Sequence, residues 1–231
     1  MKAIEVRGIS RAFGDHTIFE KLSLHVGHGE LVALLGPSGC GKTTILRCLA
    51  GLDKPDTGWF NVNGESGIVF QEPRLLGWLD VRGNVAFAAR TPEERARVDE
   101  LIELVGLTSA TKKLPKELSG GMAQRTALAR SLVRNPHVLL LDEPFAAVDA
   151  LRRYELQRQL RAIVEARGLS ALIVTHDVDE AIFLADRILV LGGEPATIRT
   201  ELQQGANREH LLAALASDGK DDVATSARTT C

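Results

Sequence analysis

The stretch of sequence that decides the fold is Leu34-Leu35-Gly36-Pro37-Ser38-Gly39-Cys40-Gly41-Lys42-Thr43-Thr44. A short apolar run, residues 31–35, leads into this glycine-rich loop, and an apolar segment that favours helix, residues 45–52, follows it. Strand, glycine-rich loop and helix in this order are the context that a phosphate-binding loop needs. The alternative is a plain glycine-rich turn between a strand and a helix.

The residue types of this loop explain how it would hold a phosphate group. Its glycines carry no Cβ, so the chain can curl and direct successive backbone N–H groups at one point. A helix that begins near Lys42 adds the positive end of its dipole. Lys42 would reach the β- and γ-phosphates, and the Thr43 hydroxyl would hold Mg²⁺. The predicted nucleotide-binding residues here are Gly36, Pro37, Ser38, Gly39, Cys40, Gly41, Lys42, Thr43 and Thr44.

Composition and charge limit the classes of function. The 231 residues, of which 45% are apolar and 25% charged, suffice for one α/β domain with a subdomain. The net charge of −2 gives no electrostatic case for binding nucleic acid or an anionic membrane. No secretory signal or bilayer-spanning run is found, so a membrane role would work through a partner. The cysteines, Cys40, Cys48 and Cys231, indicate neither disulfides nor a metal site and fit a reducing cytoplasm.

Hydrophobic periodicity divides the chain into a sheet-rich core and a helical insertion. Residues 1–71 and 135–205 predict the core, in which alternating strands near the N-terminus form an antiparallel β-subdomain. Residues 72–134 predict an inserted α-helical subdomain. We therefore predict one domain over residues 1–216 and a polar, aperiodic, disordered tail over residues 217–231.

The same patterns locate individual elements. Short continuous apolar runs are typical of central parallel strands. They predict buried strands at residues 31–35, 67–70, 137–141 and 170–175. Helical periodicity and end signals predict helices over residues 81–90, 92–105, 120–135, 150–167, 179–185 and 207–216.

Polar residues follow each of the four predicted buried strands: the phosphate loop, Gln71, Asp142-Glu143 and His176. In a parallel α/β sheet, ligands bind at the carboxyl ends of the strands. Asp142 could hold Mg²⁺, and Glu143 could take a proton from the attacking water or orient it. Gln71 could bind the metal or the water, and His176 could hydrogen-bond the γ-phosphate region. Taken singly, the Asp-Glu-Pro stretch could be only a turn and His176 only structural.

A second anion-binding feature is Leu118-Ser119-Gly120-Gly121-Met122. Ser119 is predicted to cap a helix that two glycines open, and such an N-terminus attracts anions. This motif lies in the helical insertion and not in the core sheet. One chain could fold it back on its own nucleotide, or a second copy could offer it in trans. The alternative is a plain capped helix.

With these motifs, about residues 2–205 of the chain resemble the ATP-binding cassette (ABC) subunit of an ABC transporter. Residues 69–78 and 175–181 are similar to the ATPases of nitrate-, sulfonate- and taurine-type importers. Phe13 falls where the family places its adenine-stacking aromatic residue. The matching motifs are Walker A at residues 36–44, the Q-loop at Gln71, the signature at 118–122, Walker B at 138–143, the D-loop at 146–149 and the switch histidine at His176.

The resemblance implies a P-loop NTPase (RecA-like) core and an ATP hydrolase coupled to transport. It implies a head-to-tail homodimer with two ATP molecules, each lying between the phosphate loop of one chain and Ser119-Gly120-Gly121 of the other. The implied cofactors are ATP and Mg²⁺. The implied metal ligands are Thr43, Gln71 and Asp142, and the implied catalytic residues are Lys42, Gln71, Glu143 and His176.

The resemblance also implies partners and a location. A membrane permease would contact the Arg74–Leu79 region, and a solute-binding protein would act indirectly, so the chain would sit at the cytoplasmic face of the inner membrane. Met122 stands where the signature usually has Gln, and Gly77 where Pro is common. A soluble ABC ATPase without a permease is the alternative function. A P-loop GTPase is disfavoured because the sequence has no Asn-Lys-x-Asp stretch.

Overall fold

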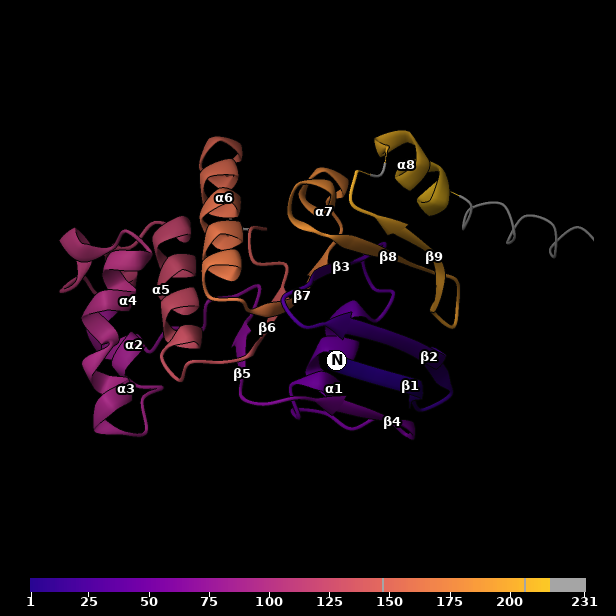
Figure 1. Ribbon diagram of the computed structural model, residues 1–231, viewed down its shortest axis with the longest axis horizontal. Coiled ribbons are helices and arrows are strands. Elements are labelled where there is room, and N and C mark those ends of the chain that lie inside the picture. The colour runs from indigo at the N-terminus through magenta and orange to yellow at the C-terminus, as the bar shows by residue number, and fades with distance from the viewer. Residues whose placement is uncertain (147, 206, 217–231) are drawn as a thin grey trace, which may run out of the picture.

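A computed structural model of the chain describes residues 1–216, with the exception of Ala147 and Ala206. Two β-sheets and a group of helices lie side by side, with the helices at one end (Figure 1). The predicted α/β fold class is confirmed. The tail predicted over residues 217–231 lies outside the described residues.

The larger sheet has six strands in the order β5-β6-β7-β3-β8-β9. The first five in this order run parallel, and β9 pairs antiparallel with β8. Every residue of β3, β6, β7 and β8 is buried, which is why their sequences are continuous apolar runs. Their bounds are β3 Leu31–Leu35, β5 Ser66–Val69, β6 Val138–Asp142, β7 Ser170–Thr175, β8 Arg187–Gly192 and β9 Thr197–Gln203.

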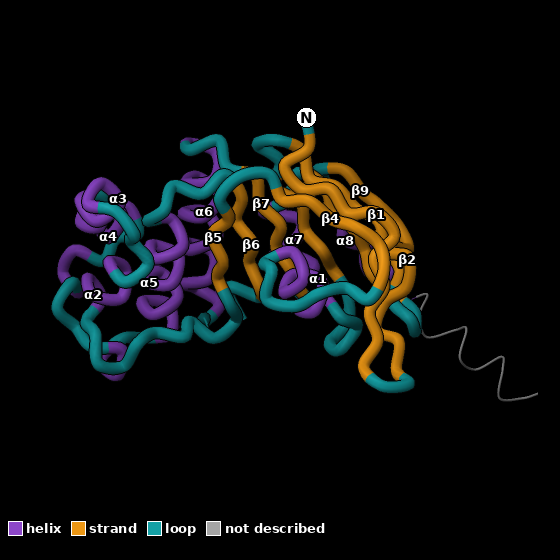
Figure 2. Tube along the Cα trace, turned by 90° about the horizontal axis from the view of Figure 1, so that it is seen from below, coloured by secondary structure: helices purple, strands orange, loops and turns teal. Residues whose placement is uncertain are grey.

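The smaller sheet is antiparallel, in the order β2-β1-β4. Its strands are β1 (Lys2–Phe13), β2 (His16–Gly27) and β4 (Thr57–Val62). Helix α1 (Lys42–Leu49) lies between the two sheets (Figure 2), and its apolar side chains share one buried core with both. The loop that precedes α1 is thereby fixed by packing on two sides.

The opposite face of the larger sheet is covered by α6 (Ala150–Ala166), α7 (Val178–Leu184) and α8 (Arg208–Ala216). A second core cluster forms there and extends into the helices beyond β5. The carboxyl ends of the parallel strands are therefore left to the loops that follow them.

The helical group beyond β5 consists of α2 (Val81–Ala86), α3 (Pro92–Ala96), α4 (Val98–Leu104) and α5 (Gly120–Leu132), with short 3-10 turns at Thr108–Ala110 and Pro115–Glu117. Helix α5 packs against α2, α4, β5 and α6, so it joins this group to the core. No helix among the described residues has the length and apolar character needed to cross a membrane.

Three helices predicted in this group are wrong in extent. The helix predicted over residues 92–105 is broken at Arg97, whose guanidinium bonds the Val133 carbonyl and the Asn135 side chain. The helix predicted to reach residue 135 ends at Leu132, because Asn135 adopts a left-handed conformation before a proline. The helix predicted over residues 81–90 ends at Ala86, beyond which the chain tightens into i to i−3 bonds.

Candidate functional site

The glycine-rich loop joins β3 to α1 and closes around the side chain of Lys42. Gly41 caps α1 at φ 90°, and a Cβ there would collide with Ile18. Lys42 is only 5% exposed, and its Nζ donates to the carbonyl oxygens of Gly36 (2.8 Å) and Pro37 (2.6 Å). It forms no salt bridge within the part of the chain that the structure describes. The ammonium group also lies 3.9 Å from the Cys40 sulfur. A buried ammonium group held by neutral partners fits the binding of a phosphate.

The predicted metal ligands converge at the ends of β3, β5 and β6. The Thr43 hydroxyl donates to Asp142 Oδ1 at 3.0 Å, and both residues line one pocket of about 500 Å³ with Gln71. Burial raises the pKa of the Asp142 carboxyl, and the hydrogen bond from Thr43 opposes that rise. Hydroxyl, amide and carboxylate oxygens are the donors that Mg²⁺ prefers, so the residues present fit that ion.

No group of three or more His, Cys, Asp or Glu side chains that could hold a metal occurs within residues 1–216, leaving aside the two undescribed positions. A magnesium ion at Thr43, Asp142 and Gln71 would therefore take its remaining ligands from water and from a substrate. That requirement agrees with the usual mode of Mg²⁺ binding beside phosphates.

Glu143 and His176 face each other across neighbouring strand ends. The distance from His176 Nδ1 to Glu143 Oε1 is 3.1 Å. Glu143 has φ 41°, a left-handed conformation that costs a non-glycine residue about 1–3 kcal/mol. Its backbone N–H donates to the Val174 carbonyl at 2.9 Å, which holds that conformation in place. The backbone of Glu143 is thus held in a strained conformation that places its carboxylate beside the His176 imidazole.

The loop that carries His176 is supported by a residue that sequence reasoning missed. Glu180 is 5% exposed, and its Oε2 accepts from the Thr175 hydroxyl at 3.0 Å. The same hydroxyl oxygen accepts from the Asp177 N–H at 3.0 Å. Burial raises the pKa of Glu180 to about 8. In the sequence, the only sign of this support was a glutamate four residues after His176.

Arg47 was also missed, although it lines the same pocket as Thr43, Gln71 and Asp142. It lies on α1 four residues after Thr43, on the same face of the helix. The spacing could have found this residue once the helix after the phosphate loop was predicted. Its guanidinium adds a positive charge to a pocket suited to phosphates.

Phe13 ends β1 and is 51% exposed. The guanidinium carbon of Arg11 lies 4.7 Å from the centroid of its ring, and Arg11 is itself held by Asp56 (2.7 Å) and Asp53 (3.0 Å). Directly after this strand end, His16, Thr17 and Ile18 line a pocket together with Pro37, Ser38, Gly39 and Cys40 of the phosphate loop. The half-exposed ring is thus close in sequence to a wall of that pocket and is available for stacking.

The second anion-binding motif lies elsewhere. Ser119 caps α5 as predicted, since its side chain accepts from the Met122 N–H at 3.3 Å. Ser119 and Gly121 line a separate pocket with Arg125, Arg152 and Glu155. Within one chain, therefore, Thr43, Gln71 and Asp142 share a pocket, and Glu143 pairs with His176. Ser119, Gly120 and Gly121 remain apart from them.

The comparisons with known proteins agree with this geometry. The family model described as "ABC transporter" matches residues 19–146. A relative from Pseudomonas syringae pv. tomato, named "Aliphatic sulfonates import ATP-binding protein SsuB 2", is 47% identical over 226 residues, covering 95% of this chain and 97% of that protein. A protein of the same name from Pseudomonas aeruginosa is 49% identical over 212 residues, covering 86% of this chain and 85% of that protein.

Solved structures support the same assignment. The chain resembles a structure titled "Dimeric structure of a post-hydrolysis state of the ATP-binding cassette MJ0796 bound to ADP and Pi", with a TM-score of 0.77 and 27% identity. That match covers 88% of this chain and 100% of the other. A second dimeric structure of the same bacterial cassette gives a TM-score of 0.78 and 28% identity.

Fold and site together define an ATP-binding cassette, the P-loop ATPase unit that the sequence predicted. The chain belongs to the ABC transporter family, and within it to the importer ATPases of the nitrate, sulfonate and taurine type. The predicted family, fold and ATPase activity are thereby confirmed.

Proposed function

We propose that this chain, as a homodimer, hydrolyses ATP to drive uptake of a small organic sulfonate or a similar anion through a separate permease. The observation that carries the proposal is the convergence of buried Lys42, the Thr43–Asp142 pair and the Glu143–His176 pair at the ends of one parallel sheet. The choice of solute is supported by relatives named as import proteins for aliphatic sulfonates.

Each residue at the sheet edge receives a role from its surroundings. Lys42, already desolvated, binds the β- and γ-phosphates in exchange for the carbonyls that it now contacts. Thr43, Asp142 and Gln71 hold Mg²⁺, which when bound neutralises charge on the phosphate oxygens. Glu143 orients the attacking water and accepts its proton. His176, whose Nδ1 lies 3.1 Å from Glu143 Oε1, hydrogen-bonds the γ-phosphate region.

The proposed homodimer completes this site. Ser119 and Gly121 line a separate pocket of the same chain, so a second copy would supply them together with Gly120 between them. The backbone N–H groups at the start of α5 would then meet the terminal phosphate from the other side. One cassette of this fold has been solved as a dimer in two structures, one of them with ADP and Pi.

The proposed permease surface lies beside Gln71. A pocket there is lined by apolar Leu76 and Phe87 together with the guanidinium groups of Arg74, Arg90, Arg130 and Arg134. Trp78, next along the chain, is 76% exposed. Such a surface suits a segment with apolar and acidic side chains at the cytoplasmic face of the inner membrane. A solute-binding protein would act on the permease and not on this chain.

We also propose the subdomain boundaries: a nucleotide-binding core at residues 1–71 and 135–205, and a helical subdomain at 72–134. Helices α2 to α5 all lie within the second range, which supports that division.

The experiment is uptake of a radiolabelled alkanesulfonate into cells or vesicles in which this chain is co-expressed with a candidate permease. Uptake should depend on this chain and on ATP, and labelled nitrate and taurine should test the anion preference. ATP hydrolysis that stays unchanged in the presence of the permease and saturating solute, with no uptake of any of the three, would refute the transport role. Retention in the membrane fraction only when the permease is expressed would support it.

A further inference from the structure

Two side chains of helix α5 are hydrogen-bonded to the chain on both sides of Gln71. Gln124 Nε2 donates to the carbonyl oxygen of Phe70 at 3.2 Å, directly before Gln71. Arg130 Nη2 donates to the Pro73 carbonyl at 2.6 Å, and Arg130 Nη1 to the Arg74 carbonyl at 2.9 Å. Two side chains of one helix thus hold both ends of a five-residue segment, 70–74.

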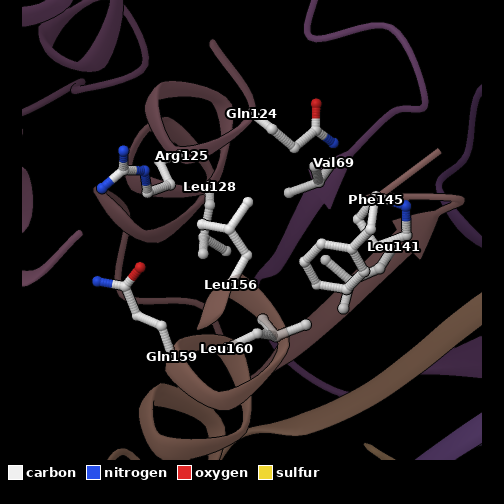
Figure 3. A pocket seen from close by; sticks show the side chains of 10 residues that line it. Val69, Gln124, Arg125, Leu128, Leu141, Phe145, Leu156, Gln159 and Leu160 are labelled. Carbon is white, nitrogen blue, oxygen red and sulfur yellow. The ribbon is translucent and has the colours of Figure 1, made fainter. Parts of the chain in front are cut away.

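The Gln124 contact lies in a seam where α5 and α6 meet the core sheet, whereas Arg130 lines the pocket of Leu76 and Phe87. Figure 3 shows Gln124 extending toward Val69, while Arg125 and Gln159 lie on the other side of Leu156. Arg125 and Gln159 donate to carbonyls at the end of α4, at Val105 (3.2 Å) and Leu104 (2.9 Å). The seam therefore contains two classes of amide and guanidinium contact, one with the Gln71 segment and one with the helical group.

The desolvation cost of burying Gln124 and Arg130 suggests that their hydrogen bonds have a role beyond packing. Gln124 is 5% exposed, and a buried amide is tolerated only when it is hydrogen-bonded. Burial lowers the pKa of the Arg130 guanidinium, which forms no salt bridge with any residue that the structure describes. An apolar residue at either position would avoid that desolvation cost.

We propose that Gln124 and Arg130 are positioning residues that tie Gln71 to the Ser119 end of α5, so that both parts of the nucleotide site move together. The inference rests on the roles proposed above for Gln71 and Ser119. Ser119 caps the same 13-residue helix that carries both side chains. When a nucleotide on a second chain engages that helix end, any shift of α5 is transmitted to residues 70–74 through three hydrogen bonds.

The test compares Gln124→Met and Arg130→Met with matched controls. Gln157→Met removes another buried amide, on α6, and Arg97→Met removes another guanidinium that donates to a carbonyl beside α5. Neither residue lines the pocket of Thr43 or that of Ser119, and neither is hydrogen-bonded to residues 70–74 in the described part of the chain. Hydrogen exchange is measured by mass spectrometry with and without the non-hydrolysable analogue AMP-PNP and Mg²⁺. The readout is the gain in protection that the analogue causes at residues 36–44, 70–74 and 118–124.

In the wild type and both controls, all three segments should gain protection. In Gln124→Met and Arg130→Met, the gain at residues 70–74 should fall several-fold while that at residues 36–44 persists. Turnover should fall about ten-fold at unchanged KM, which a merely structural loss of stability would not produce.

A full gain at residues 70–74 in both variants would overturn the inference alone, and so would a wild type in which only residues 36–44 respond. A wild type that gains no protection anywhere and does not hydrolyse ATP would instead refute the proposed function.

Discussion

The sheet edge (Lys42, Thr43 and Asp142) and the N-terminal tip of α5 (residues 119–121) both suit phosphate. They differ in how far their polar groups are already buried and hydrogen-bonded within one chain. At the sheet edge, Lys42 and Asp142 are at most 5% exposed and already hydrogen-bonded within the chain. At the tip, Gly120 is exposed, and the Ser119 hydroxyl caps its own helix by accepting from the Met122 N–H. A buried charge must have fixed partners before the ligand arrives. Backbone N–H groups at a surface are hydrated instead and can exchange water for a ligand. We therefore expect one chain to bind nucleotide alone and a second chain to complete the site.

The largest effect should come from the sheet edge. Glu143→Gln should lower turnover about a thousand-fold while ATP affinity changes little, because an amide cannot accept the proton of the attacking water. Steady-state phosphate release and equilibrium binding of a fluorescent ATP analogue measure the two quantities.

The control is Glu72→Gln, which removes an acid that lines the pocket of Thr43 and Asp142 but has no assigned role. Near wild-type hydrolysis by Glu143→Gln would remove Glu143 from catalysis and leave the sheet edge a binding site only.

The next effect should come from the tip. Ser119→Arg should abolish ATP-dependent dimers and lower turnover about a hundred-fold, because the added bulk excludes the partner's nucleotide from donors on the helix end. ATP binding by the monomer should persist, since Ser119 lies in a different pocket from Thr43. Size-exclusion chromatography with ATP and thermal melts measure assembly and folding.

Thr91→Arg is the matched control, because Thr91 caps α3 in the same helical group and its loss costs a comparable cap, about 1 kcal/mol. Unchanged dimerisation in Ser119→Arg would contradict a tip that works in trans.

A smaller effect is the pH dependence of stability caused by Glu180, which holds the loop that carries His176. An unfolded glutamate titrates near 4.5, but burial raises the pKa of Glu180 to about 8 in the folded chain. Between these values the folded state keeps a proton that the unfolded state loses, so the free energy of unfolding decreases as pH rises from about 4.5 to about 8. Glu180→Gln removes that dependence.

From pH 6 to pH 9, the melting temperature of the wild type should fall about 5–10 °C further than that of Glu180→Gln. Glu103→Gln, an exposed glutamate of α4, should behave as the wild type. Parallel melting curves for the wild type and Glu180→Gln would show that Glu180 ionises normally.

The same contrast explains what the sequence could predict. The sheet-edge residues follow apolar strands directly, so their meeting point was set once the strands were recognised as parallel. The start of α3 is equally local, since Thr91 and Glu94, three residues apart, form a full capping box. The break at Arg97 and the grip of Arg130 on residues 73–74 depend on partners 36 to 57 positions away, which no local pattern encodes.

The smallest effect should appear at the base-binding end of the site. Phe13 and Trp59 form a matched pair: both lie in the smaller sheet, are about half exposed (51% and 50%), and have an arginine over the ring. Only Phe13 lies beside the strand end whose neighbours, His16 to Ile18, share a pocket with the phosphate loop. Phe13→Leu should therefore weaken ATP binding about three- to ten-fold, the contribution expected of one stacked aromatic contact.

Trp59→Leu should leave that affinity unchanged, and isothermal titration of both variants with ATP and with inorganic triphosphate separates base from phosphate binding. Triphosphate, which has no base to stack, should bind Phe13→Leu as it binds the wild type. Equal losses for ATP in the two variants would mean that Phe13 acts through the stability of the smaller sheet and not through adenine. Such a result would confine the nucleotide contacts of a single chain to the edge of the larger sheet.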